Sequence, residues 1–228
     1  MNSNTLYLLV LLAFVFSLIA QGMTNRTYDK YSKFATSSGL TGGEVARRIL
    51  AKEGIENVRI EVVNGKLTDH YDPQSLTLRL SSATMYGQNV AAVGVAAHEV
   101  GHVLQHRDAY APLSLRTACV KTVNIGSHAA WPIFLLGLIL SYQPLLYVGI
   151  GLYAAIVFFT VITLPVEFNA SHRALSCLTS DGYLTHEEAS GARSVLSAAA
   201  MTYVAAALSA ILQLLRLMAI ANNNRRRN

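Results

Sequence analysis

The string His98-Glu99-Val100-Gly101-His102 holds the residue types of a zinc hydrolase at the spacing that such a site needs. On a helix, two histidines four residues apart lie on one face about one turn apart, so both imidazoles can bind one metal ion. Glu99 stands beside the first histidine, where its carboxylate could act as a general base on a metal-bound water. The string therefore predicts a catalytic zinc site with one Zn²⁺ per chain.

The segment around this string has the pattern of a helix. Residues 89–107 contain no proline, and their apolar side chains recur at helical spacing. Gly94 and Gly101 lower the helix propensity, so we expect a packing reason for each of them. The alternative is a buried helix with purely structural histidines, which would leave Glu99 without a purpose on a largely apolar helix.

A catalytic zinc site needs a third protein ligand and one open position for water. His106 lies eight residues after His98, which is about 12 Å along a helix and too far to share the ion. Glu167 is the better candidate, because it follows a long apolar stretch, where a carboxylate needs a partner or a function. An ordinary carboxylate at a membrane interface is the alternative.

Residues 67–73, 94–102 and 165–171 resemble the YugP-type family of neutral zinc metallopeptidases of bacterial membranes. The similarity runs over nearly the whole chain, from about Tyr31 to the last apolar segment. The resemblance implies that His98 and His102 bind the metal and that Glu99 is the catalytic base.

The same resemblance supports Glu167 as the third ligand, as in a membrane gluzincin. Membrane gluzincins such as the CAAX prenyl proteases carry a similar Glu-Phe-x-Ala stretch. Those relatives have an Asp four residues after the ligand Glu, where this chain has Ser171. A serine can orient a ligand through a hydrogen bond, although more weakly than a charged aspartate does.

Several other polar residues are candidates for supporting the ligands or contacting substrate, namely His70, Asn169, Ser171 and Arg173. An oxyanion-stabilising group is also needed, and the candidates, each of which could instead be structural, are His70, His172, Arg173 and Tyr203. Residues 76–80 alternate like a strand and could bind an extended substrate at a sheet edge, or could form an ordinary half-buried strand.

Composition indicates a membrane protein, since 52% of the residues are apolar and only 14% are charged. Four stretches could cross a bilayer: residues 5–23, 125–140, 145–164 and 195–215. The first could be a signal peptide, but no basic residue precedes it and no small-x-small cleavage site follows, which favours a retained anchor. The last could instead be a soluble packing helix.

We therefore expect a mainly α membrane protein, with a minimal zincin-like α+β catalytic domain and about four transmembrane helices. The expected segments are a transmembrane anchor (1–23), the catalytic domain with the HExxH helix (24–120), a transmembrane hairpin (121–166), a third-ligand helix and loop (167–194), and a C-terminal transmembrane helix with a basic tail (195–228). Within the catalytic domain the expected order is a helix starting at Thr41 and stopping at Gly54, strands 58–63 and 76–80, and the zinc helix.

Charge and connectivity suggest where the site lies. Two crossings separate residue 102 from Glu167, so both are expected on one side of the membrane, with the zinc at its surface. The basic residues that flank the spans lie mostly on that side, which predicts a multi-pass cell-membrane protein with a cytoplasmic catalytic domain. The net charge of +5 is explained by this location, and no nucleic-acid partner is expected.

The function predicted from the sequence is a membrane-embedded zinc endopeptidase that acts on a peptide or a membrane protein near the lipid bilayer. Two alternatives stay open. The chain could be a non-catalytic membrane adaptor with a structural zinc, or a zinc hydrolase of a non-peptide bond, since the motif names the nucleophile and not the bond. A membrane adaptor subunit is a further possible partner. Cys119 and Cys177 have no metal-binding spacing.

Overall fold

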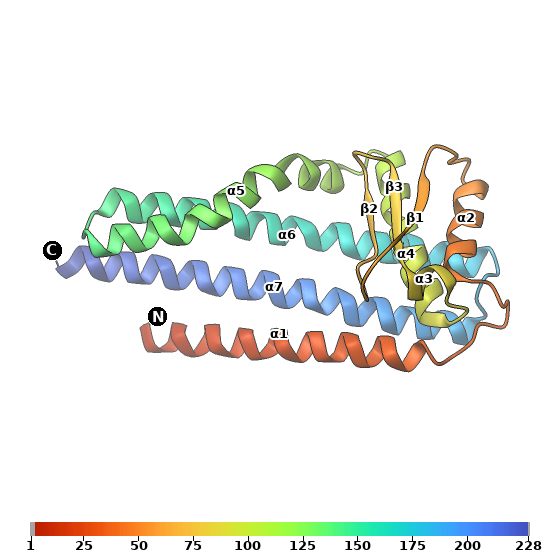
Figure 1. Cartoon of the computed structure of the whole chain (residues 1–228). Coiled ribbons are helices and arrows are strands. Elements are labelled where there is room, and N and C mark those ends of the chain that lie inside the picture. The colour runs from red at the N-terminus through yellow and green to blue at the C-terminus, as the bar shows by residue number, and fades with distance from the viewer. Residues whose placement is uncertain (1–2, 228) are drawn as a thin grey trace. The chain divides into compact units, whose positions relative to one another are not determined.

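The computed structural model describes residues 3–227, with side chains described for residues 5–225. The chain is mainly helical and carries one small sheet (Figure 1). The elements in chain order are α1 (Ser3–Tyr31), α2 (Gly42–Lys52), β1 (Arg59–Val63), β2 (His70–Asp72), β3 (Thr77–Ser81), α3 (Ser82–Tyr86), α4 (Val90–Arg107), α5 (Ala111–Ile139), α6 (Gln143–Ser180) and α7 (His186–Arg227).

These elements form two compact units. The apolar unit comprises Met1–Ala20, Ser114–Pro165 and Met201–Asn228, and the mixed unit comprises Gln21–Leu113 and Val166–Ala200. Helices α1, α5, α6 and α7 each contribute residues to both units. The predicted division of the chain into five segments stays a prediction.

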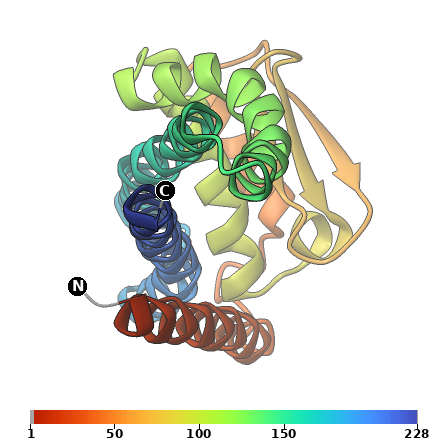
Figure 2. The same ribbon diagram turned by 90° about the vertical axis from the view of Figure 1, so that its left-hand side faces the viewer.

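The apolar unit is built from helices alone. Helix α7 contacts α1 where the hydroxyls of Ser17 and Ser209 lie 3.2 Å apart, and it contacts α6 where Gln143 donates to the carbonyl of Ala221. Figure 2 looks along these helices and shows α7 between α1 and α6. A small core closes the unit, formed by Phe134, Leu146, Leu217 and Ala221.

Four helices in the described part of the chain are long and apolar enough to cross a membrane, which agrees with the four predicted spans. Only between 11% and 28% of the most apolar window of each helix is buried inside the protein. Large apolar side chains therefore face outward, for example Ile125 and Ile139, which are 74% and 79% exposed. Such continuous apolar surface is typical of helices that contact lipid.

The helices extend beyond the spans predicted from hydropathy. Helix α6 continues past Pro165 to Ser180, so Glu167 lies in the same helix as the apolar stretch before it. Helix α5 likewise begins at Ala111, well before its apolar stretch. Hydropathy marks where lipid contact ends, whereas a helix ends only where its backbone hydrogen bonds end.

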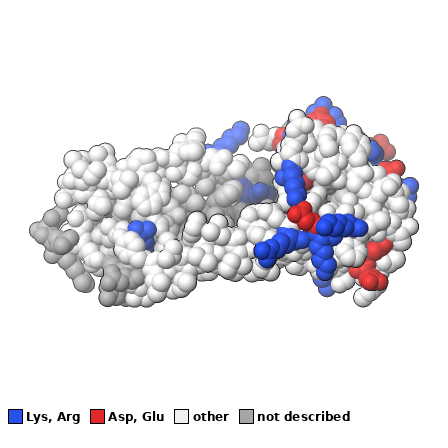
Figure 3. Space-filling model, turned by 60° about the horizontal axis from the view of Figure 1, so that its bottom comes forward, with Lys and Arg blue, Asp and Glu red and all other residues white. Residues whose placement is uncertain are grey.

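Charge separates the two units. All 13 acidic residues of the sequence belong to the mixed unit. Figure 3 shows most of the charged side chains gathered over that unit, with only isolated basic side chains elsewhere on the same face. This distribution agrees with lipid contact by the apolar unit and water contact by the mixed unit.

The sheet of the mixed unit has the order β1-β3-β2, with β1 parallel and β2 antiparallel to β3. Strand β3 is therefore paired on both sides, and Leu78 and Leu80 are fully buried. The proposal that residues 76–80 bind substrate at a sheet edge is wrong, because this strand has no free edge. The expected order of elements also lacked β2 and α3, both of which are too short to show a period in the sequence.

The main core of the mixed unit surrounds α4. Apolar residues of α4 such as Val93 and Val100 pack with Val45 and Ile49 of α2 and with the buried leucines of β3. The N-terminus of α4 is capped by Asn89, whose Oδ1 accepts a hydrogen bond from the backbone N–H of residue 92 at 2.9 Å. The zinc-motif segment is therefore a helix, as predicted, and it is held on several sides.

The two glycines of α4 have the packing reason expected from the sequence. A Cβ added at Gly101 would meet the backbone carbonyl oxygen of Ala170 in α6. A Cβ at Gly94 would lie 3.2 Å from the Cβ of Ala192 in α7. The two positions let α4 lie close against α6 and α7, which brings the motif histidines near Glu167.

The sequence signals at both ends of α2 are also confirmed. Thr41 and Glu44 form a reciprocal capping box at the start of α2, and Gly54 follows the helix with a φ of +67°. Thr185 and Glu188 exchange the same pair of hydrogen bonds at the start of α7.

Candidate metal centre

His98, His102 and Glu167 meet in the mixed unit. The Nε2 atom of His98 lies 3.3 Å from Oε2 of Glu167, and Nε2 of His102 lies 3.7 Å from the same oxygen. The potential ligand atoms of the three residues all lie within 4.8 Å of one another. Helix α4 supplies both histidines one turn apart, and α6 supplies the carboxylate, as the sequence predicted.

The other nitrogen of each imidazole has a partner within the protein. Nδ1 of His98 lies 3.0 Å from Oγ of Ser171, one turn after Glu167 on α6. Nδ1 of His102 lies 3.0 Å from Oε1 of Gln105. Metal-binding histidines are commonly held by such a hydrogen bond at the nitrogen that does not face the ion. Both Nε2 atoms are consequently left to face Glu167.

The centre is mostly shielded from water. Glu167 is 3% exposed and His102 is 8% exposed. Burial on its own would lower the pKa of His102, but the hydrogen bond to Glu167 and the charges of Glu99 and Glu167 outweigh it and raise that pKa. In the metal-free protein the carboxylates thus favour a proton on His102, where a metal ion would supply the positive charge instead.

Glu99 is also buried, at 8% exposed, and it has no hydrogen bond or ion pair with any residue that the structure describes. It precedes Val100 on α4, directly after the first histidine. A carboxylate next to a metal-ligand histidine is the residue type that a general base at such a site requires.

The donor set fits a zinc ion. Two imidazole nitrogens and one carboxylate oxygen are ligands that zinc prefers, and a catalytic site uses three protein ligands and leaves one position open. The hydrogen bonds at the two Nδ1 atoms leave the Nε2 atoms free for a metal. His98, His102 and Glu167 would hold the ion.

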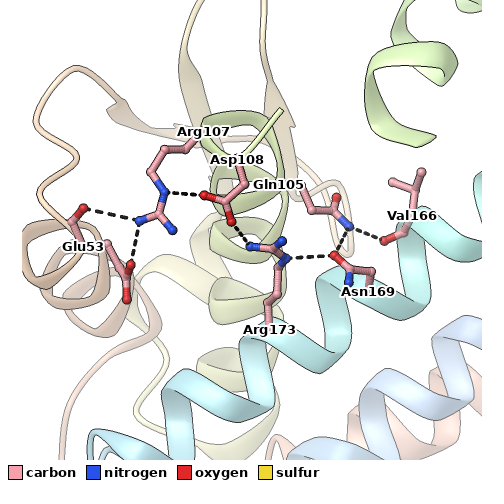
Figure 4. Close-up of polar contacts among 7 residues, drawn as sticks. All are labelled: Glu53, Gln105, Arg107, Asp108, Val166, Asn169 and Arg173. Carbon is pink, nitrogen blue, oxygen red and sulfur yellow. Dashed lines mark hydrogen bonds and ion pairs between the residues drawn. The ribbon is translucent and has the colours of Figure 1, made fainter. Parts of the chain in front are cut away.

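Of the remaining predicted site residues, some lie next to the three candidate ligands and others do not. Asn169 and Arg173 lie on α6 and belong to the polar contacts around Gln105 (Figure 4). His70 is exposed on β2, where its Nδ1 lies 2.8 Å from the carbonyl of Thr68, so it does not join the three residues. Tyr203 belongs to the part of α7 in the apolar unit.

His106 does not join the centre, as expected from its distance along the helix. Its Nδ1 lies 2.8 Å from the hydroxyl of Tyr71 on β2. Burial and the charge of Asp72 raise the pKa of Tyr71 to about 12, so this hydroxyl stays protonated at neutral pH. The contact ties the edge strand β2 to the last turn of α4.

Gln105 is the residue of this centre that the sequence analysis missed. It is fully buried on α4, three residues after His102, and it contacts both that histidine and α6. The signal that could have found it is an uncharged polar residue at helical spacing from a ligand within an apolar helix.

A pocket of about 680 Å³ opens between α6 and α7 beside Ser171. Its walls include Phe168, Leu175 and Ala189, with His172 and Arg193 among the polar residues. Ser171 lines this pocket and also contacts His98, so only this one side chain separates the pocket from a motif histidine.

Comparison with known proteins agrees with the class of site. The model of the family described as "Putative neutral zinc metallopeptidase" matches residues 6–222. The chain belongs to this family of zinc metallopeptidases. It is also 47% identical over 220 residues to "Putative membrane protease YugP" of Bacillus subtilis (strain 168), covering 96% of this chain and 98% of that protein. No solved structure matches the chain.

Proposed function

We propose that this protein is a membrane-embedded zinc endopeptidase of the gluzincin type that hydrolyses peptide bonds near the membrane surface. The observation that carries the proposal is the meeting of His98, His102 and Glu167, with ligand atoms within 4.8 Å of one another. Glu99 is buried nearby, and its charge acts on His102. Family membership supports the metal and the reaction class. The name of the relative supports a membrane protease.

Zinc bound at the three ligands would lower the pKa of a bound water toward about 7 and polarise the carbonyl of the substrate. The carboxylate of Glu99 accepts a proton from the water as the water oxygen attacks the carbonyl carbon of the peptide bond. The same carboxylate then donates that proton to the leaving amine, so the peptide nitrogen departs as a neutral group. Ser171 and Gln105 keep the imidazoles oriented throughout.

The substrate is proposed to be a peptide segment in extended conformation. Strand β2 lies at an edge of the sheet and is joined to α4 through Tyr71 and His106. An extended substrate segment could pair with this free edge, since main-chain hydrogen bonds give affinity without a sequence requirement. The pocket beside Ser171, with its largely apolar walls, would take a substrate side chain.

We propose that the site lies close to the membrane surface on the cytoplasmic side, and two features of the sequence support this. Glu167 comes three residues after the apolar stretch that ends near residue 164. The basic residues that flank the spans favour a cytoplasmic catalytic domain in a multi-pass cell-membrane protein. The zincin-like character of the mixed unit belongs to this proposal. It is supported by the HExxH helix packed beside a small sheet.

An adaptor with a structural zinc site is less well supported, because such sites use four protein ligands and the described residues group only three here. Hydrolysis of a non-peptide bond would use the same residues. The adaptor subunit and the membrane-protein substrate remain proposals, identified only by their chemistry.

The test compares wild type with Glu99→Gln, purified in detergent, for zinc content and for cleavage of an unfolded membrane-protein substrate. Glu99→Gln should keep the ion and lose at least about 10³-fold in turnover, since it can no longer take a proton. Glu187→Gln, an exposed carboxylate at the start of α7, is the matched control and should keep both. Equal turnover in wild type and Glu99→Gln would refute the proposed chemistry.

A further inference from the structure

The side-chain amide of Gln105 has a single orientation that satisfies its neighbours. Its Nε2 lies 2.8 Å from the carbonyl oxygen of Val166 and 3.0 Å from Oδ1 of Asn169 (Figure 4). A backbone carbonyl can only accept a hydrogen bond, so the NH₂ group must face Val166. Both amide hydrogens are then used, and Oε1 is left facing Nδ1 of His102 at 3.0 Å.

The orientation of Asn169 is fixed in turn by a charged neighbour. Nε of Arg173 donates to Oδ1 of Asn169 at 2.8 Å, and a guanidinium has no acceptor. The other side of the same guanidinium is paired with Asp108, which also accepts from Arg107. Oδ1 is therefore the atom that faces Gln105, and it accepts from both Arg173 and Gln105.

We propose that Gln105 is a positioning residue that holds His102 as the Nδ1-protonated tautomer and so keeps the Nε2 lone pair available for a metal ion. An amide oxygen can only accept, so Nδ1 must carry the hydrogen in this contact. In a neutral imidazole the lone pair is then on Nε2. This inference rests on the proposed zinc site and adds the residue that sets the state of one ligand.

The contact matters because Glu167 favours the opposite tautomer in the metal-free protein. Its carboxylate accepts hydrogen bonds only, and it lies 3.7 Å from Nε2 of His102, where a hydrogen on Nε2 would be attracted to it. Gln105 opposes this tautomer from the other side of the ring. Ser171 cannot do the same for His98, because a hydroxyl both donates and accepts.

The decisive variant is Gln105→Met, which nearly keeps the side-chain volume and removes the acceptor and both donors. In metal-free protein with ¹⁵N-labelled histidine, at an alkaline pH where the His102 imidazole is neutral, the wild type should show His102 protonated at Nδ1, and the variant should show a mixture of both tautomers. The zinc dissociation constant, measured by competition with a chelator, should rise by about 10- to 100-fold. Gln74→Met, at an exposed glutamine before β3, is the matched control and should change neither result.

A second variant separates orientation from general loss of packing. Gln105→Glu keeps an acceptor toward His102, so the Nδ1-protonated form should persist, although the carboxylate now faces the oxygens of Val166 and Asn169 and lowers the melting temperature. If Gln105→Met does not fold, the wild-type protein still decides the question, because an Nε2-protonated neutral His102 in the metal-free wild type would overturn the proposal.

Unchanged tautomer and zinc affinity in folded Gln105→Met would overturn the proposal. A wild type that takes up no zinc would contradict the proposed function instead. The tautomer measurement uses metal-free protein, so it still decides on Gln105 in that case.

Discussion

Oγ of Ser171 lies 3.0 Å from Nδ1 of His98. A neutral hydroxyl gives a weaker hydrogen bond to an imidazole than a carboxylate does. Ser171 thus holds His98 less strongly than a carboxylate would. Replacement of Ser171 by aspartate or by alanine should therefore change the zinc affinity in opposite directions.

We expect Ser171→Asp to strengthen zinc binding by about 3- to 10-fold and Ser171→Ala to weaken it by about 10-fold, because orienting partners of ligand histidines contribute to metal affinity. Competition titration with a chromophoric chelator measures both. Ser176→Ala, on the same helix and lining the same pocket, serves as the control. A weaker site in Ser171→Asp would mean that a second charge beside Glu167 outweighs the better hydrogen bond.

Removal of the third ligand should abolish tight metal binding. Glu167→Gln replaces a charged oxygen donor by a neutral amide, and the zinc dissociation constant should rise at least about 100-fold. Glu56→Gln changes an exposed carboxylate of the mixed unit and should leave the affinity unchanged. Retention of one tightly bound zinc in Glu167→Gln, measured by elemental analysis, would exclude Glu167 as a ligand.

Close packing of α4 against α6 should be as important as the ligands. In Gly101→Ala the new methyl group meets the carbonyl of Ala170, which forces the two helices apart at a cost of about 1–3 kcal/mol. Zinc affinity should fall together with the melting temperature. Gly22→Ala is the matched helical control, because a Cβ there meets nothing within 4 Å. Wild-type zinc affinity in Gly101→Ala would show that the ligands do not depend on this approach.

Zinc affinity should increase with pH. The pKa of His102 is raised in the metal-free protein, so protonation of this residue adds stability that is fully present below the unfolded pKa of about 6.5. That stability is lost as the pH rises through the higher folded value. Because zinc must displace this proton, its apparent affinity should rise by roughly tenfold per pH unit until the pH exceeds the folded pKa.

Calorimetric titrations in two buffers of different ionisation enthalpy measure the number of protons released. We expect about one proton per zinc below the folded pKa of His102 and fewer protons above it. Zinc affinity that is the same on both sides of this pKa would contradict a protonated His102 in the metal-free protein.

The sequence alone identified the candidate site residues that stand out by their spacing or by their surroundings in the chain. His98 and His102 are found by helical spacing alone, and Glu167 by its unusual place after an apolar stretch. Gln105 could not be found in this way, because its importance comes from Val166 and Asn169, which are more than 60 residues away in the chain.

The fold, like the site, could be predicted from the sequence only in part. Hydropathy indicated four membrane-spanning stretches, and four helices that could span are present. The position of β3 at the centre of the sheet was not predictable, because it depends on β2, whose three residues pair with β3 through contacts that only the folded chain forms. Short strands carry too little periodic signal to be identified on their own.

The shortness of β2 limits how a proteolytic site of this kind could choose what it cuts. A substrate segment that pairs with the three residues His70–Asp72 forms only a few main-chain hydrogen bonds. These bonds are the same for every substrate sequence. Selection among substrates would then depend on other features. One is the fit of a substrate side chain in the pocket beside Ser171. Another is whether a polypeptide unfolds close to the bilayer. Under the proposed function, so small a sheet would make cleavage depend on access to the substrate more than on its sequence.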